Sequence, residues 1–382
     1  MNAAHWLAKW WLTALILLGT GYVWASSTAA AGYVGWWMPS GWRALEGNRL
    51  DRIYFFDIEI QADGTLGDHH GWPDKWQDLR EYAATKDTPL EVSVSLMNAA
   101  HFHRIFSNPT AIKTLEDAIF RLAMDAATSG VHVDVEMYGD LNARDIAAYR
   151  FFLQRLSQRL AALSPRKGLS IFLPFQTKSF LYDRETLGFI DHVVVQGYDS
   201  HWADGKVAGP VAPLDGPYAL TWKSAVAAAD RLGIARGKQF LSFPLYGYEW
   251  HVSSGDGVRR PIKGKGLTTS YAPLSKEDRE SAEIEVNVLG RVLQYGSRYD
   301  AVAASSSYRF ISPDGKQFEG WYDDWLGLQK KTEYLKKEKL GGVAFFLLGY
   351  DGGALVNPYL QESEQTRGRL NSDPPTPPAS GP

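Results

Sequence analysis

The chain has 382 residues, of which 45% are hydrophobic and 13% aromatic, enough to bury a large core. Its formal net charge is −3 and its lysines and arginines are scattered, which argues against a nucleic-acid partner. Cysteine is absent, which excludes disulfides, thiolate metal ligands and cysteine nucleophiles, whereas the 14 tryptophans suit both cores and surfaces that stack on sugars.

Residues 1–31 have the features of a secretory signal. Lys9 precedes an apolar stretch over residues 10–25, and small residues follow in an alanine cluster at 29–31. We expect cleavage after Ala25 or within that cluster, and export to the periplasm or the exterior. An uncleaved membrane anchor is the alternative, because the stretch falls only a little short of the roughly 20 apolar residues that span a bilayer.

Between residues 32 and 360, short apolar runs alternate with amphipathic stretches, as in strand–helix units around a parallel sheet. The eight candidate strands are 33–37, 52–58, 90–96, 130–136, 169–173, 192–197, 239–245 and 342–348. The clearest helical patterns are 109–129, 142–163, 221–233 and 325–337. Eight units predict an α/β fold, the (β/α)8 TIM barrel, with catalytic side chains at the C-terminal ends of its strands. A doubly wound sheet ranks second, because no glycine-rich phosphate loop follows the first strand.

Two segments fall outside the repeating pattern. The stretch from about 251 to 320 is too long for an ordinary loop and contains β-prone runs at 301–304 and 308–311. We therefore expect a small α+β insertion between the seventh and eighth strands, forming one wall of a groove. Residues 361–382 are polar and end in prolines, which predicts a disordered tail.

The fourth candidate strand carries the strongest functional signal. Residues 131–136 alternate strictly, so that three valines face one side and His132, Asp134 and Glu136 face the other. Burying two carboxylates and an imidazole is costly unless they pair, bind or react, and this favours a functional site. Taken alone, the alternation also fits an edge strand with one wet face.

Several blocks of the chain resemble glycoside hydrolase family 18, the chitinase-like family. Residues 129–136 are similar to its DGxDxDxE signature on the fourth strand. Further similar blocks, in the family's order, are 53–66, 196–199, 243–250, and 321–324 followed by 340–343. The resemblance covers about residues 33 to 355. It implies the barrel fold and a glycosidase that cleaves β-1,4-linked N-acetylglucosamine-containing polysaccharide.

The resemblance also implies a retaining mechanism in which the substrate's N-acetyl group is the nucleophile, so that one protein acid suffices. Glu136 matches the general acid, Asp134 the residue that bonds the acetamido nitrogen, and Tyr198 the donor to the acetamido oxygen. Seven further residues are expected to bind substrate: His132, Gln196, Asp199, Tyr246, Trp250, Phe346 and Trp37.

Some positions depart from the family's pattern. Ser129 and His132 replace the first two aspartates of the signature, and the second of these normally shares a proton with the position of Asp134. His132 is expected either to hold Asp134 ionised in place of that aspartate or to be a core histidine in a site without chemistry. Phe346 aligns with the tryptophan that usually floors the sugar site, and Gln196 replaces a methionine of many members.

We therefore expect an exported, monomeric glycosidase without cofactor or metal, whose partner is an N-acetylglucosamine-containing polysaccharide or oligosaccharide. It would contact a membrane only through an uncleaved N-terminal segment. The histidines at 69–70 and at 101 and 103 lack a carboxylate at ligand spacing, which disfavours a metal site. The alternatives are a catalytically inactive, chitinase-like lectin and an assembly factor for a cell-envelope polysaccharide.

Overall fold

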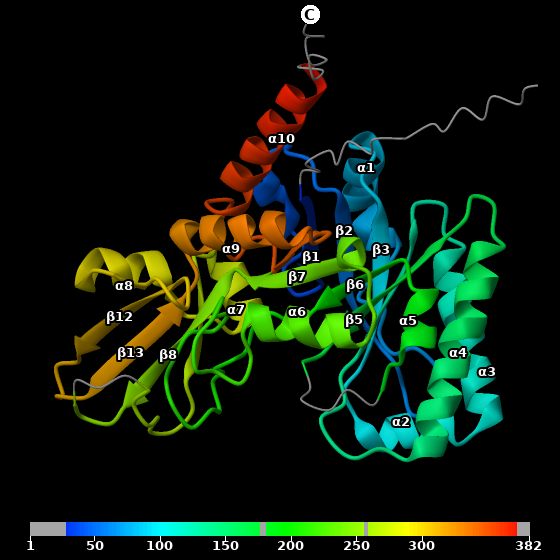
Figure 1. Ribbon diagram of the computed structural model, residues 1–382, viewed down its shortest axis with the longest axis horizontal. Helices are drawn as coiled ribbons and strands as arrows, with labels where there is room; N and C mark the ends of the chain where they lie inside the picture. The colour runs from blue at the N-terminus through cyan, green and yellow to red at the C-terminus, as the bar shows by residue number, and fades with distance from the viewer. Residues whose placement is uncertain (1–27, 176–180, 256–258, 373–382) are drawn as a thin grey trace, which may run out of the picture.

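The centre of the molecule is a closed barrel of eight parallel strands (Figure 1). The computed structural model describes residues 28–175, 181–255 and 259–372. Around the barrel the strands follow the order β1-β14-β7-β6-β5-β4-β3-β2. Their bounds are β1 (Ala29–Gly35), β2 (Arg52–Glu59), β3 (Leu90–Leu96), β4 (Gly130–Val135), β5 (Gly168–Leu173), β6 (His192–Val195), β7 (Gln239–Pro244) and β14 (Gly342–Phe346). Every residue of β3 and β4 is buried, as expected for parallel strands covered on both faces.

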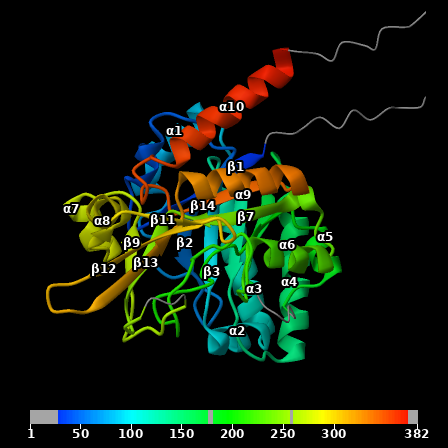
Figure 2. The same cartoon turned by 60° about the vertical axis from the view of Figure 1, so that its left-hand side comes forward.

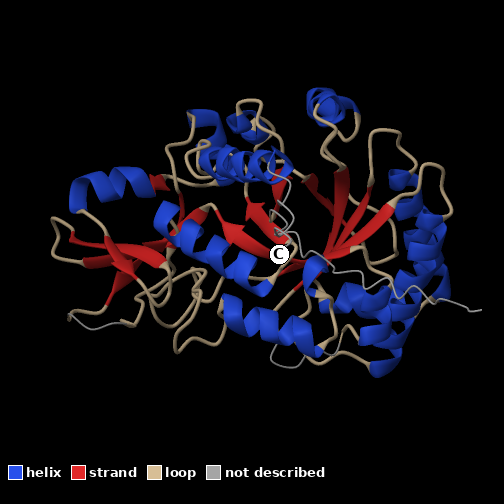
Figure 3. Cartoon of the chain, turned by 45° about the horizontal axis from the view of Figure 1, so that its top comes forward, coloured by secondary structure: helices blue, strands red, loops and turns tan. Residues whose placement is uncertain are grey.

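Helices surround the strands of the barrel (Figure 3). The α-helices outside the insertion are α1 (Gln77–Thr85), α2 (Ala99–Phe106), α3 (Pro109–Ala123), α4 (Ala143–Ala161), α5 (Arg184–Gly188), α6 (Trp222–Arg231), α9 (Trp325–Glu338) and α10 (Val356–Ser372). Short 3-10 helices are η1 (Gly41–Leu45), η2 (Asp74–Trp76) and η3 (Arg236–Lys238). Asn98, Asn108 and Asn142 cap α2, α3 and α4, because their side-chain oxygens accept the first free backbone N–H groups. No helix in the described ranges has the length and apolar content to cross a membrane.

The predicted barrel is confirmed, with differences at the ends of its elements. All eight predicted strands are present, but the first begins at Ala29 instead of residue 33 and the eighth ends at Phe346 instead of 348. The four predicted helices correspond to α3, α4, α6 and α9. The prediction did not name α1 and α2, because helices of two or three turns give too few apolar repeats to stand out.

The predicted insertion between the last two barrel strands is also confirmed. It is a six-stranded sheet of order β10-β9-β8-β13-β12-β11 with two helices, and it projects to the left of the barrel in Figure 1. Its elements are β8 (Tyr246–Val252), β9 (Leu267–Ser270), α7 (Lys276–Ala282), β10 (Val286–Asn287), α8 (Val288–Tyr295), β11 (Arg298–Asp300), β12 (Ser305–Ile311) and β13 (Gln317–Tyr322). The sheet begins at Tyr246, earlier than the expected start near 251, so its first strand leaves the barrel directly after β7.

The N-terminal boundary of the barrel differs from the prediction. Ala30 and Ala31 are buried in β1, and Ala29 pairs with Gly342 of β14. The alanine cluster assigned to the signal segment is therefore part of the barrel, because small side chains fit where β1 closes against β14. The rest of the signal prediction falls on residues 1–27, outside the described residues.

The C-terminal boundary differs as well, since α10 occupies the first half of the predicted tail (Figure 2). The Tyr359 ring is buried, lies 5.3 Å from the Phe345 ring, and has its hydroxyl 2.9 Å from that of Thr28. Arg367 forms two hydrogen bonds of 3.0 and 2.6 Å to Asp51. These tertiary contacts stabilise a polar helix that composition alone does not predict. Residues 373–382, which hold the prolines, lie outside the described residues.

Candidate active site

Two carboxyls lie together at the C-terminal end of β4. Asp134 is only 3% exposed, whereas Glu136, just beyond the strand, is half-buried. The backbone N–H of Glu136 donates to the Leu96 carbonyl at 3.1 Å, so pairing with β3 continues past the end of β4. Alternation along the strand puts both carboxyls on the same face. Glu136 is therefore the acid that a substrate can reach, with Asp134 directly beneath it.

The environment of these acids favours their protonated forms. The pKa of Asp134 is raised well above its usual range, first by burial and then by the charges of Glu136 and Asp57. Burial also raises the pKa of Glu136, a hydrogen bond from the Tyr138 hydroxyl opposes this, and the charge of Asp199 adds to it. Among the described residues, no lysine or arginine forms an ion pair with these carboxyls. A carboxyl that stays protonated near neutral pH suits general acid catalysis.

Tyr198 and Asp199 follow β6 and lie beside these acids. The Tyr198 ring lies 6.2 Å from that of Phe172, which is in register with Asp134 on the neighbouring strand. Burial raises the Tyr198 pKa well above its usual value, and the charges of Glu136, Asp199 and Asp134 raise it further. Asp199 accepts hydrogen bonds from Tyr246 (2.7 Å) and from Tyr248 (3.2 Å). Burial raises the pKa of Asp199 to about 6, against the effect of these two hydroxyls. The insertion thus contributes two tyrosines to the site through β8.

Phe346 and Trp37, which the sequence analysis expects to bind substrate, lie at the mouth of the barrel. The half-buried ring of Phe346 lies 5.4 Å from the Phe56 ring and 5.7 Å from the Tyr198 ring, between the centroids. Trp37 is also half-buried, meets Phe56 edge to face at 6.0 Å, and donates its indole N–H to the Tyr350 hydroxyl at 3.0 Å. Together these rings form an apolar floor beside the acids.

Two other predicted substrate contacts are used inside the protein. Trp250 is fully buried and donates its indole N–H to the Trp202 carbonyl at 3.2 Å, so its prediction as a substrate contact is wrong. The reason is that β8 runs away from the barrel mouth, and by Trp250 it has entered the core of the insertion. Gln196 is buried too, and its side-chain oxygen accepts the Phe175 N–H at 2.8 Å, fixing the segment after β5.

His132 lies deeper in the barrel and does not take part in the site. Its Nε2 is 3.0 Å from the Tyr33 hydroxyl and its Nδ1 is 2.7 Å from the Ser170 hydroxyl, so neither nitrogen is left for Asp134. Burial lowers the pKa of His132 to about 3, which leaves the ring neutral. His132 is therefore a core histidine with both ring nitrogens engaged, and its predicted substrate contact and relay to Asp134 are wrong.

The direction of the hydrogen bonds around His132 follows from Glu91. Arg52 and His192 beside Glu91 outweigh its burial and hold its pKa at about 2, so this carboxylate is ionised. It accepts the proton of the Ser170 hydroxyl. Ser170 then accepts from Nδ1–H of His132, and Nε2 accepts from the hydroxyl of Tyr33. A neutral histidine satisfies this arrangement without a charge in the barrel centre.

The sequence analysis did not name two residues of the site, Asp57 and Tyr138. Asp57, on β2, is 8% exposed and accepts a hydrogen bond from the Ser95 hydroxyl of β3. Tyr138 follows Glu136 by two residues and is 66% exposed, with its hydroxyl bonded to the acid. A signal for Asp57 was present, since it is a charged residue inside the apolar run 53–60, where an unpaired carboxylate is expensive.

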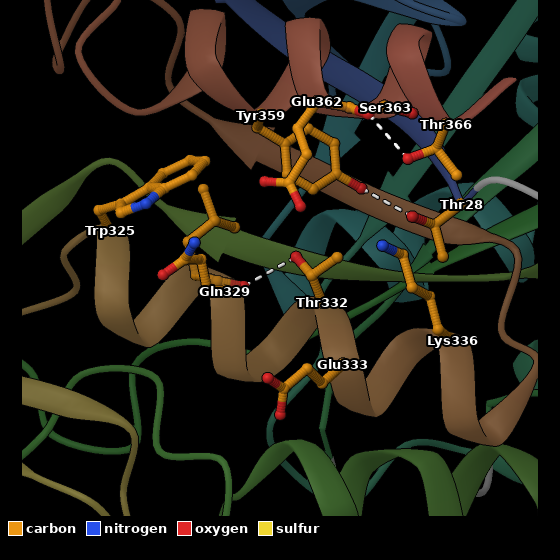
Figure 4. A pocket seen from close by; sticks show the side chains of 11 residues that line it. Thr28, Trp325, Gln329, Thr332, Glu333, Lys336, Tyr359, Glu362, Ser363 and Thr366 are labelled. Carbon is orange, nitrogen blue, oxygen red and sulfur yellow. Dashed lines mark hydrogen bonds between the residues drawn. The ribbon is translucent and has the colours of Figure 1, made fainter. Parts of the chain in front are cut away.

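A hollow at the opposite end of the barrel is not the candidate site. It has a volume of about 190 Å³ and lies between α9 and α10, where Tyr359 and Thr28 meet (Figure 4). Thr28 precedes β1, so this hollow adjoins the N-terminal ends of the strands, whereas catalytic groups in this fold gather at the C-terminal ends. In the part of the chain that the structure describes, no three histidine or acidic side chains are grouped to hold a metal ion.

The similarity to known proteins extends over all eight strands of the barrel. The model of the family Glycosyl hydrolases family 18 matches residues 29–351. A cortical fragment-lytic enzyme of Bacillus anthracis is 23% identical over 313 residues, which cover 78% of this chain and 65% of that enzyme. The chain thus spans just under two thirds of that relative's length.

Solved structures share the fold. The spore cortex-lytic enzyme SleL of Bacillus megaterium QM B1551 aligns with a TM-score of 0.65 and 20% identity, over 87% of this chain and 74% of SleL. A chitinase from Cycas revoluta in complex with (GlcNAc)3 aligns with a TM-score of 0.70 and 18% identity, over 88% of this chain and 99% of the chitinase.

Proposed function

The chain belongs to glycosyl hydrolases family 18, and on that premise we propose that it is a retaining glycosidase acting on β-1,4-linked N-acetylglucosamine-containing polysaccharide. The observation that carries the proposal is the pair of Asp134, buried, and Glu136, accessible, beside Tyr198 at the C-terminal end of the barrel. The substrate class is supported by the chitinase that binds (GlcNAc)3 and by the cortex-lytic relatives.

In the proposed reaction the acetamido oxygen of the substrate attacks the anomeric carbon while Glu136 protonates the departing glycosidic oxygen. The products of this step are the shortened chain and a cyclic oxazolinium ion. Asp134 accepts the acetamido N–H and balances the positive charge, and Tyr198 donates to the acetamido oxygen. Glu136 then takes a proton from water, which attacks the anomeric carbon and reopens the ring with retained configuration.

The test compares hydrolysis of N-acetylglucosamine oligomers by the wild type and by Glu136→Gln. We expect the substitution to lower kcat at least about 10²-fold while leaving oligomer binding within a few-fold, because Gln keeps the shape and loses the proton. Asp140→Asn, an exposed acid four residues further on, is the matched control and should hydrolyse at the wild-type rate. Equal rates for Glu136→Gln and the wild type would overturn the proposal.

One observation favours a second candidate, a sugar-binding protein without turnover. The hydroxyl of Tyr138 already occupies one carboxylate oxygen of Glu136, and its exposed ring lies beside the acid. If that contact persists in the complex, only the other oxygen of Glu136 is left to protonate a glycosidic oxygen. Calorimetric binding of chitotetraose by the wild type, with no product from acetylated or partly deacetylated chains, would support this candidate over the hydrolase.

A further inference from the structure

The proposed reaction needs Asp134 to change its protonation and its partner, and His132 does not serve this purpose. Both ring nitrogens of His132 are engaged by Tyr33 and Ser170, and the ring is neutral. The family's inner aspartate therefore has no functional replacement at its own position. Another group must exchange the proton with Asp134 if the reaction proceeds as proposed.

Asp57 is the group that the fold of the barrel places in a position to exchange a proton with Asp134. Ser95 of β3 is in register with Asp134 of β4, so the two side chains point to the same face of the sheet. On the other side of Ser95, the register of β2 shifts between Phe55 and Ile58, and Asp57 lies within this irregular stretch. Its carboxyl accepts the Ser95 hydroxyl. Asp57, Ser95 and Asp134 thus form a row across three neighbouring strands.

In the described ranges, no lysine or arginine forms an ion pair with either carboxyl of this row. Asp57 and Asp134 are 8% and 3% exposed, and Oδ1 of Asp134 has no hydrogen-bond partner in the described part of the chain. Burial raises the pKa of Asp57, although the Ser95 hydroxyl opposes this, and the charge of Asp57 contributes to the raised pKa of Asp134. Two buried carboxyls that repel each other in this way favour a state with one proton between them.

We propose that Asp57 is the positioning residue for Asp134 and that the two carboxyls hold one proton between them, an inference that rests on the proposed function. In the free enzyme Asp134 carries the proton. When Asp134 turns to the acetamido N–H of the substrate, the proton passes to Asp57, beside the Ser95 hydroxyl. The pair keeps a charge of −1 throughout, so no further donor or acceptor is required.

Other titratable groups face the pair and must be controlled for. On the Asp57 side they are Glu59 and His70, and on the Asp134 side they are Glu136, Tyr33, Tyr138, Tyr149, Tyr182 and Tyr198. Glu59 is exposed and stands two residues from Asp57 on the same strand. Glu59→Gln removes one negative charge close to the pair and leaves the row intact, so it is the matched control.

The first experiment measures the titration of Asp134 directly, by NMR of protein labelled at the aspartate side-chain carboxyl carbons. The Asp134 signal is identified by its loss in Asp134→Asn. We expect Asp57→Asn to lower the Asp134 midpoint by about one pH unit or more, because the repelling charge is removed. Glu59→Gln should leave the midpoint within about 0.3 units. An Asp134 titration in Asp57→Asn that superimposes on the wild type would overturn the proposal.

The second experiment separates a positioning role from a structural one. We expect Asp57→Asn to lower kcat about 10- to 100-fold with KM within about threefold, and to move the acidic limb of the kcat profile in the same direction as the NMR midpoint. Should Asp57→Asn fail to fold, Ser95→Ala replaces it, since this variant keeps the carboxyl and should raise the Asp57 midpoint. An unchanged Asp57 midpoint in Ser95→Ala would contradict the proposed row of Asp57, Ser95 and Asp134.

The two experiments also distinguish the two proposals. The NMR titration requires no turnover, so a wild type that shows the Asp57–Asp134 coupling and hydrolyses nothing would count against the glycosidase and leave the shared proton in place. If the wild type hydrolyses oligomers but the titrations of Asp57 and Asp134 are independent, the result would count against the role of Asp57 and not against the glycosidase.

Discussion

At the scale of single residues, the protonation of Glu136 is set by opposing neighbours. Burial and the charge of Asp199 raise its pKa, and the hydroxyl of Tyr138 lowers it. A general acid must be protonated to act, so this balance sets the basic limb of the pH profile. Of the neighbours that change the pKa of Glu136, Tyr138 can be substituted without disturbing the core, because its ring is mostly exposed.

Tyr138→Phe removes the hydrogen bond and should raise the pKa of Glu136. The basic limb of kcat/KM is then expected to move to higher pH by up to about one unit, because the acid stays protonated longer. The measurement is the pH profile of kcat/KM on a chitooligosaccharide. Tyr299→Phe, at an exposed tyrosine of the insertion, should give the wild-type profile. A limb that moves to lower pH would show that Tyr138 does not lower the pKa of the acid.

At the scale of elements, the hydrogen bonds of His132 join strands below the site. They link β4 to Tyr33 of β1 and to Ser170 of β5, and through Ser170 to Glu91 of β3. A neutral histidine is required, because a cation there would have to be desolvated. The stability of the barrel should therefore depend on pH through this residue.

The sign follows from the pKa of His132, which is about 3 in the fold against an ordinary value of 6.5. The unfolded chain binds the proton more readily, so this contribution is fully present above about pH 6.5 and is lost as the pH falls toward 3. Between pH 7 and pH 5 the loss from His132 should be about 2 kcal/mol. Glu91 adds little in that interval, because its own loss begins below its ordinary value of 4.5.

His132→Gln is the corresponding prediction. The variant should be less stable than the wild type at pH 7, because two hydrogen bonds are disturbed, but should lose less stability between pH 7 and pH 5. Urea unfolding at both pH values measures this difference. His101→Gln, at a half-buried histidine of α2, should lose as much stability between pH 7 and pH 5 as the wild type does. Parallel losses in His132→Gln and the wild type would contradict the neutral buried histidine.

The helix α10 gives a second prediction at this scale. Tyr359 packs on Phe345 of β14, and its hydroxyl meets Thr28. Tyr359→Ala should lower the free energy of unfolding by about 3 kcal/mol, whereas Tyr359→Phe should cost about 1 kcal/mol through the lost hydrogen bond. Gln361→Ala, at an exposed position of the same helix, is the control and should change stability by less than about 0.5 kcal/mol. If Tyr359→Ala left the free energy of unfolding unchanged, α10 would not pack on the barrel in solution.

At the scale of the whole molecule, Glu136, Asp199 and several exposed aromatic rings lie on segments that follow barrel strands. Trp36 follows β1, Tyr138 follows β4 and Trp202 follows β6, and these rings are 39%, 66% and 49% exposed. The Trp36 ring stacks on that of His70, with centroids 3.9 Å apart and an angle of 3°. Flat rings held in this way suit contact with the apolar faces of sugars.

We expect Trp36→Ala to raise KM for long N-acetylglucosamine oligomers about tenfold, with kcat changed less than about threefold, because a ring away from the acids contributes binding energy only. Steady-state kinetics on oligomers of increasing length measures the effect. Leu326→Ala, at an exposed position on α9, is the control. A fall in kcat without a change in KM would place Trp36 in the reaction itself.

Much of the architecture followed from the sequence alone. Alternating apolar runs and helical stretches predict the barrel because each strand must bury both faces and each helix one. The 70-residue gap in that pattern predicts the insertion for the same reason. Local chemistry was enough for Asp134 and Glu136, since alternation along a single strand determines that both face the same side.

Tertiary structure decided the rest, because it depends on which strands meet and where each one ends. His132 is on the predicted face of β4, yet its partners on β1 and β5 remove it from the site. Trp250 is removed because β8 runs into the insertion. Asp57 joins Asp134 only because closing the barrel aligns β2, β3 and β4 around Ser95. Spacing along a chain fixes the face of a side chain, whereas burial and hydrogen-bond partners come from segments distant in sequence.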